Sequence, residues 1–142
     1  MTIHHFDVAA LDYEKAGQVS SQIKKMVKEY GFDPITVRRI AVATYEAEIN
    51  LIIHSHGGRV TVNYEAPWLY LIFKDIGPGI PDLEKAMRPG WSTASKEAQA
   101  MGFGAGLGLV NIQKNSDTFR LTSDPSGTTL ELGFKKQTEE PA

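Results

Sequence analysis

Residues 75–82 read Asp-Ile-Gly-Pro-Gly-Ile-Pro-Asp, and they directly follow the run Trp-Leu-Tyr-Leu-Ile-Phe-Lys at 68–74. The aromatic and β-branched residues of that run predict a buried strand. Two glycines and two prolines then end the strand in a tight loop whose shape is restricted before any ligand binds. A flat ligand could lie against the backbone at Gly77 and Gly79, where the Asp75 carboxylate would accept a hydrogen bond from an amine. The alternative is an ordinary β-turn with an acidic first residue.

The residues around this stretch predict a sheet with helices on one face. Residues 59–65 alternate with period two and Ala66-Pro67 forms a turn, so 59–65 and 68–74 form an antiparallel hairpin. Asp33-Pro34 predicts the start of a helix, with an N-cap followed by proline. The other predicted elements are strands at 2–8, 117–123 and 128–135 and helices at 11–30, 34–55 and 106–115. This order favours a two-layer α/β sandwich with a mixed, mostly antiparallel sheet.

The length and composition limit the classes of function. A chain of 142 residues predicts one domain, residues 1–135, followed by a polar tail at 136–142. The net charge of -2 gives no reason to expect direct binding to nucleic acid or to a membrane. The absence of cysteine excludes disulfides and thiol catalysis. With no apolar run long enough to span a bilayer and no signal-peptide pattern, the expected location is the cytoplasm.

Three polar residues share one side of the helix predicted at 34–55. Glu46, Asn50 and His54 are spaced by four residues, so their side chains lie in one stripe, whereas Glu48 points elsewhere and is expected in solvent. The stripe is either a solvated face or a site. An asparagine amide oxygen is a hard ligand suited to Mg²⁺, and a carboxylate one turn away can act as a base in phosphoryl transfer.

A second glycine cluster, Gly-Phe-Gly-Ala-Gly-Leu-Gly-Leu at 102–109, opens the helix predicted at 106–115. Glycines before a helix let backbone N–H groups and the positive end of the helix dipole converge on a phosphate. A dinucleotide-binding fingerprint is rejected, because the cluster does not follow a buried strand. The segment 89–104 before it is typical of a lid or of disorder. Within it, Thr93 or Lys96 either reaches a phosphate oxygen on closure or is solvated.

The ordered set of Glu46-x-x-x-Asn50, Asp75-x-Gly-x-Gly and the glycine cluster ending at 109 resembles the three nucleotide boxes of the Bergerat-fold (GHKL) ATPases. That superfamily includes histidine kinases, the gyrase and mismatch-repair ATPases and a heat-shock chaperone. The resemblance implies that Asn50 holds Mg²⁺, that Glu46 is the base and that Asp75 accepts a hydrogen bond from the adenine amino group. It also implies that Thr128 or Thr129 lies near Asp75.

The resemblance places the other nucleotide contacts in the two glycine-rich loops. Glycines of the first loop would flank the purine, and those of the second would wrap the phosphates of ATP. The implied cofactor-binding residues are Gly77, Gly79 and Ile80 in the first loop and Gly104, Gly106, Leu107 and Gly108 in the second.

The small size and the run Ala-Met-Arg-Pro-Gly-Trp-Ser-Thr-Ala at 86–94 are similar to the stand-alone anti-sigma-factor and stressosome-switch serine/threonine kinases. The resemblance implies a Mg-ATP-dependent kinase that phosphorylates a small anti-anti-sigma-type protein and binds a sigma factor or another regulatory protein in alternation. It also implies a homodimer formed through the sheet or its first strand. The alternative is a nucleotide-gated binding module with little or no catalysis. A plain ATPase is a third possibility.

Overall fold

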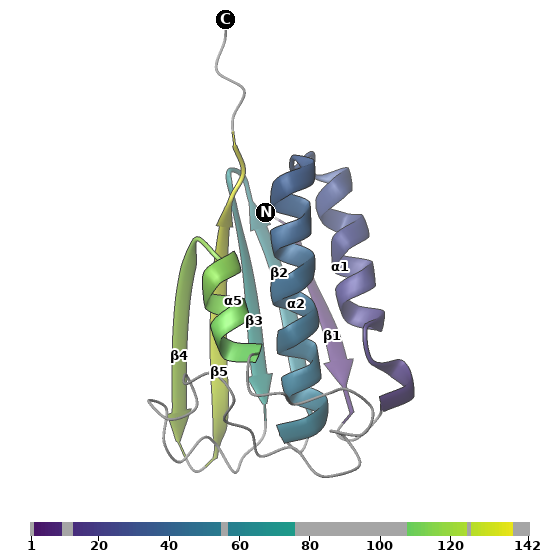
Figure 1. Ribbon diagram of the computed structural model, residues 1–142, viewed down its shortest axis with the longest axis vertical. Helices are drawn as coiled ribbons and strands as arrows, with labels where there is room; N and C mark the ends of the chain where they lie inside the picture. The colour runs from purple at the N-terminus through teal and green to yellow at the C-terminus, as the bar shows by residue number, and fades with distance from the viewer. Residues whose placement is uncertain (1, 10–12, 55–56, 76–107, 125, 138–142) are drawn as a thin grey trace, which may run out of the picture.

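The computed structural model describes residues 2–9, 13–54, 57–75, 108–124 and 126–137, which form a five-stranded sheet with helices on one face (Figure 1). The strand order is β1-β2-β3-β5-β4, and every neighbouring pair of these strands is antiparallel. The strands are β1 (Thr2–Val8), β2 (Gly58–Glu65), β3 (Trp68–Asp75), β4 (Thr118–Asp124) and β5 (Gly127–Lys135). The helices are the 3₁₀ turn η1 (Tyr13–Lys15), α1 (Gln18–Glu29), α2 (Pro34–His54) and α5 (Gly108–Asn115). The predicted two-layer sandwich is confirmed.

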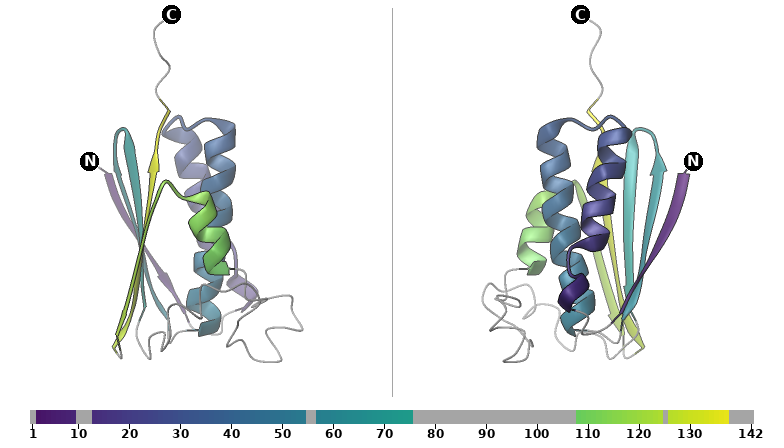
Figure 2. Two further views of the ribbon diagram at one scale, coloured as in Figure 1. Left: turned by 60° about the vertical axis from the view of Figure 1, so that its left-hand side comes forward. Right: turned by 90° about the vertical axis from the view of Figure 1, so that its right-hand side faces the viewer.

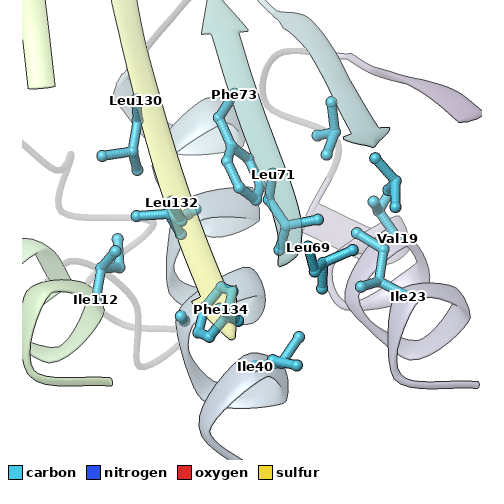
Figure 3. Packing of buried hydrophobic residues seen from close by; sticks show 14 of the residues in the cluster. Val19, Ile23, Ile40, Leu69, Leu71, Phe73, Ile112, Leu130, Leu132 and Phe134 are labelled. Atoms are coloured by element: carbon cyan, nitrogen blue, oxygen red, sulfur yellow. The ribbon is translucent and has the colours of Figure 1, made fainter. Parts of the chain in front are cut away.

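The hydrophobic core fills the space between the sheet and the helices. Alternation along β2 and β3 sends every second side chain toward the helices, and the register pairs Val60 with Phe73 and Val62 with Leu71. Figure 3 shows the side chains of β3 and β5 meeting those of the helices, including Ile112 of α5. Burial of this apolar surface is the main force that holds the two layers together.

Helix α2 occupies the middle of the helical layer, with α1 on one side and α5 on the other (Figure 1). Its predicted start is confirmed, because the Asp33 carboxylate accepts hydrogen bonds from the backbone N–H of Thr36, at 3.1 Å, and from the Thr36 hydroxyl. These bonds to Thr36 hold the pKa of Asp33 below its ordinary value. In the part of the chain that the structure describes, none of the helices combines the length and the hydropathy that a membrane span requires.

The helix predicted at 11–30 is shorter than expected, and α1 begins only at Gln18. Gly17 adopts a left-handed backbone conformation, with φ at 94°, which separates α1 from the 3₁₀ turn η1. Only glycine adopts this conformation without strain. The apolar spacing that predicted one long helix does not reveal such a break. At the other end α1 stops at Glu29, before Gly31 with φ at 87°, as expected.

Glu48 is buried, so the expectation that its side chain is solvated is wrong. Only 1% of Glu48 is exposed, and its carboxylate lies at the N-terminus of α1. It accepts hydrogen bonds from the backbone N–H groups of Gly17 (3.1 Å), Val19 (3.2 Å) and Ser20 (2.9 Å). Gly17 has no side chain to cap the helix, so a carboxylate from α2 satisfies the N–H groups at the start of α1.

We predict that Glu48→Ala lowers the free energy of unfolding by about 3 kcal/mol, because three N–H groups lose their acceptor at a buried helix end. Glu48→Gln keeps one acceptor oxygen and should lose less. Urea denaturation at neutral pH measures both changes. Glu29→Ala, at an exposed position of α1, is the control and should change stability by less than about 0.5 kcal/mol. A Glu48→Ala variant as stable as the control would refute the capping role.

Candidate nucleotide site

Three elements meet at one end of the molecule: the second half of α2, the end of β3 and the start of α5 (Figure 1). Glu46 and Asn50 lie on α2, Asp75 is the last residue of β3 and Gly108 is the first residue of α5. Leu51, next to Asn50, packs against Gly58 of β2, where a Cβ atom would lie 3.1 Å from the Leu51 side chain. Gly58 is in turn the strand partner of Asp75. The candidate site therefore spans both layers of the sandwich.

Glu46 and Asn50 both lie close to the first residue of α5, Gly108. A Cβ atom on Gly108 would lie 3.3 Å from Glu46 Oε2, which is a tight approach, and 3.4 Å from Asn50 Oδ1, which is ordinary van der Waals contact. In the sequence analysis, spacing grouped Glu46 with Asn50, and the family resemblance added Gly108. The structure places a carboxylate and an amide beside the N-terminus of a helix, and these groups are suited to a cation and a phosphate.

Glu46 is half-buried, and this burial raises the pKa of its carboxyl above the ordinary value. A hydrogen bond with the Asn111 side chain on α5 opposes the shift. Raising a carboxyl pKa toward neutral pH makes the carboxylate a better proton acceptor. Sequence reasoning missed Asn111, although its position three residues after Gly108 puts it on the same side of α5.

Asp75 is fixed by the start of β5. The backbone N–H of Thr128 donates a hydrogen bond of 2.6 Å to Asp75 Oδ1. Thr128 is 8% exposed, and its hydroxyl lies 2.9 Å from that of Ser123 on β4. Of the two threonines expected near Asp75, Thr128 is therefore the neighbour, whereas Thr129 pairs with Lys74 and faces the opposite side of the sheet.

Two glycines that the sequence analysis did not assign to the site flank Asp75 on both neighbouring strands. A Cβ atom on Gly58 would lie 2.9 Å from the Asp75 Cα atom, and one on Gly127 would overlap the Asp75 backbone carbonyl. Glycine is required at both positions because the backbones approach too closely for a side chain. In the sequence, the only indication of this role is that each glycine directly precedes a predicted strand.

Helix α5 is held in place from the far side of the site. Ile112 is fully buried in the core, and Asp117, just after α5, forms an ion pair of 2.8 Å with Arg39 of α2. Asp117 also accepts a hydrogen bond of 2.8 Å from the Lys135 backbone N–H. Burial opposes ionisation of Asp117, but the bonds from Lys135 and Arg39 together keep its pKa below the ordinary value. These contacts keep Gly108 and Asn111 against Glu46.

The remaining predicted site residues stay predictions, because they fall where the structure gives no description. These are the backbone and side chains of Gly77, Gly79, Ile80, Thr93, Lys96, Gly104, Gly106 and Leu107, and the side chain of His54. The described residues contain no group of three or more His, Cys, Asp or Glu side chains that could hold a metal ion. Mg²⁺ bound with a nucleotide needs only one or two oxygen ligands from the protein, so the Asn50 amide beside Glu46 fits it.

Comparisons with known proteins show which family this chain belongs to. The sequence model of the family described as "Histidine kinase-like ATPase domain" matches residues 9–134. The chain is 32% identical over 104 residues to the serine/threonine-protein kinase RsbT of Bacillus subtilis, covering 70% of this chain and 72% of that kinase. It is 31% identical over 100 residues to the anti-sigma F factor of Bacillus licheniformis, covering 66% of this chain and 65% of that factor.

Solved structures show the same fold at lower sequence identity. The RsbU and RsbW domains of a Mycobacterium tuberculosis protein superpose with a TM-score of 0.65 at 17% identity, over 96% of this chain and 33% of that one. The SiaB–SiaC complex of Pseudomonas aeruginosa gives 0.58 at 13% identity, over 92% of this chain and 88% of the matched chain. The family match over residues 9–134, together with the relative that is 32% identical, confirms the family that the sequence resembled: this chain belongs to the family of histidine kinase-like ATPase domains.

Proposed function

We propose that this protein is a partner-switching serine/threonine kinase, which transfers the γ-phosphoryl group of Mg-ATP to a hydroxyl group on a small protein. The observation that carries the proposal is the position of Glu46 and Asn50 beside Gly108, at the start of α5, together with the hydrogen bond between Glu46 and Asn111. A binding module without chemistry would not need a half-buried carboxylate with a raised pKa at this position. The sequence similarity of this chain to a serine/threonine-protein kinase and to an anti-sigma factor supports the same function.

Each described residue of the site would have its own role in the reaction. The Glu46 carboxylate would accept the proton of the attacking hydroxyl while the new oxygen–phosphorus bond forms and the bond to ADP breaks. The Asn50 amide oxygen would hold Mg²⁺, which neutralises charge on the phosphates. At the other end Asp75, fixed by Thr128, would accept a hydrogen bond from the adenine amino group. Both ends of the nucleotide would then be held by rigid elements.

The protein substrate in this proposal is of the anti-anti-sigma type, and a sigma factor or a similar regulator is the alternating partner. Two similarities support this: one to an anti-sigma factor, and one in fold to a chain of the SiaB–SiaC complex, in which two proteins are bound to each other. We also propose that the reaction takes place in the cytoplasm and that the protein forms a homodimer. The loop residues Gly77, Gly79, Ile80, Gly104, Gly106 and Leu107 would complete the nucleotide site.

Glu46→Ala should reduce the rate of phosphoryl transfer about 10²-fold or more, because it removes the general base. The affinity for Mg-ATP should change much less, since Asp75 and Asn50 remain. Transfer of label from radiolabelled ATP to a small anti-anti-sigma-type protein measures the rate, and calorimetry measures nucleotide affinity.

Glu131→Ala, at an exposed position of β5, is the matched control and should leave both quantities unchanged. A Glu46→Ala variant that transfers phosphate at the normal rate would disprove the assigned base. Nucleotide binding with no transfer by the unaltered protein would instead indicate a nucleotide-gated binding module.

Asn111→Ala should move the acidic limb of the pH–rate profile to higher pH. Transfer requires ionised Glu46, so the rate falls as pH drops through the pKa of that carboxyl. Burial raises this pKa and the Asn111 hydrogen bond lowers it, so removing Asn111 raises it further. Gln113→Ala, exposed on α5, should leave the profile unchanged. A limb that stays in place or moves to lower pH would contradict the assignment.

A further inference from the structure

A stripe of exposed apolar side chains runs along α2 on the side away from the sheet. Ile35, Val42 and Tyr45 are 75%, 37% and 38% exposed, and Arg38 lies between them. The spacings of three, four and three residues place all four side chains on one side of the helix. Five large hydrophobic residues are exposed in the described part of the chain, and three belong to this stripe. Such a concentration typically marks a binding surface.

The stripe borders a groove between α1 and α2, which lie side by side on one face of the sheet (Figure 2). The groove has a volume of about 760 Å³. Its floor is apolar and includes Phe32 and Val37, which are buried. Its charged lining residues are Lys24 and Lys28 from α1 and Arg38 from α2. All three are cations, in a chain whose net charge is -2.

The three cations are available to a ligand. Among the residues that the structure describes, none of them forms an ion pair, whereas Arg39, next to Arg38, is paired with Asp117. No acidic side chain lines the groove within the same part of the chain. The groove therefore combines an apolar floor with a rim of uncompensated positive charge, which favours a partner that is apolar on one face and acidic at its edges.

We propose that the α1–α2 groove is a docking surface for an acidic amphipathic helix of a partner protein. From Ile35 to Tyr45 the stripe extends about 15 Å along α2, which matches roughly three turns of a helix laid beside it. Apolar residues of the partner helix would cover Val42 and the groove floor, and its carboxylates would meet Lys24, Lys28 and Arg38. A small phosphate-containing ligand would use the cations but leave the apolar stripe uncovered.

This surface is separate from the candidate nucleotide site. Glu46 turns toward α5, whereas its neighbour Tyr45 faces the groove and lies near Gly17, where a Cβ atom would be 3.6 Å from the Tyr45 ring. Docking at the groove requires neither nucleotide nor phosphoryl transfer. Its test is run without ATP, so the failure of one proposal leaves the other standing.

The test uses a fluorescent synthetic helix of about 14 residues, roughly four turns, with leucines on one face and glutamates along both edges. A matched peptide carries lysines in place of the glutamates. Fluorescence anisotropy measures affinity, and amide chemical shifts of the isotope-labelled protein locate the site. We expect the acidic peptide to bind at least about tenfold more tightly than the basic one, with shift changes concentrated at Lys24, Lys28 and Val42.

Two variants test the two components of the groove. The double change Lys24→Glu and Lys28→Glu should weaken binding of the acidic peptide about tenfold or more, and Val42→Asn should weaken it several-fold through the lost apolar contact. Lys25→Glu is the matched control, since Lys25 is exposed on α1 but does not line the groove, and it should change affinity less than about twofold. Circular dichroism checks that each variant folds.

Three results would overturn the proposal. The first is equal binding of the acidic and basic peptides, or no binding of either. The second is a set of shift changes outside the groove. The third is tight binding to phosphatidylglycerol vesicles that is lost in the Lys24 and Lys28 double variant, together with weak peptide binding, because the groove would then be a membrane-contact surface.

Discussion

Helix α2 is packed against the sheet, α1 and α5, so each of its buried polar groups must find a partner inside the protein. This constraint shapes the rest of the structure. Glu48 binds the N-terminus of α1, Glu46 binds Asn111 of α5, and the hydroxyl of Thr44 donates to the Ile40 carbonyl at 2.7 Å. The polar residues of α2 thus bind both neighbouring helices, while its apolar residues pack against the sheet.

Two carboxylates two residues apart on α2 serve different purposes because their surroundings differ. Glu48 lies against three N–H groups at a helix N-terminus, which is a favourable environment for a carboxylate. Glu46 is partly buried, which disfavours its charged form, and the hydrogen bond with the Asn111 side chain offsets only part of this effect. Because the pKa of Glu46 is higher in the folded than in the unfolded state, its contribution to the stability of the fold is present at low pH and is lost as the pH rises through the folded-state pKa. Glu46 is held at a cost to stability, as expected of a functional group.

Sequence patterns that act within a few residues predicted much of the fold, whereas contacts between residues far apart in the chain could not be predicted from the sequence. Asp33-Pro34 marked the start of α2 because capping acts within a few residues. The break at Gly17 was missed because apolar spacing carries no information about a positive φ. Glu48 was misplaced because its partners lie 28 to 31 residues earlier in the chain. In the site, spacing grouped Glu46 with Asn50, but Asn111, Gly58 and Gly127 became visible only once the elements were assembled.

The attachments of α2 on its two flanks also restrict how it can move. The Glu48 carboxylate accepts hydrogen bonds from the N-terminus of α1, and Arg39 forms an ion pair with Asp117, next to α5. Rotation of α2 about its own axis would therefore break one of these two sets of bonds. Helix α2 would therefore tilt or slide as one rigid unit. A partner that pushes on α2 at Tyr45 would then displace Glu46 by a similar distance, because both residues belong to the same rigid helix.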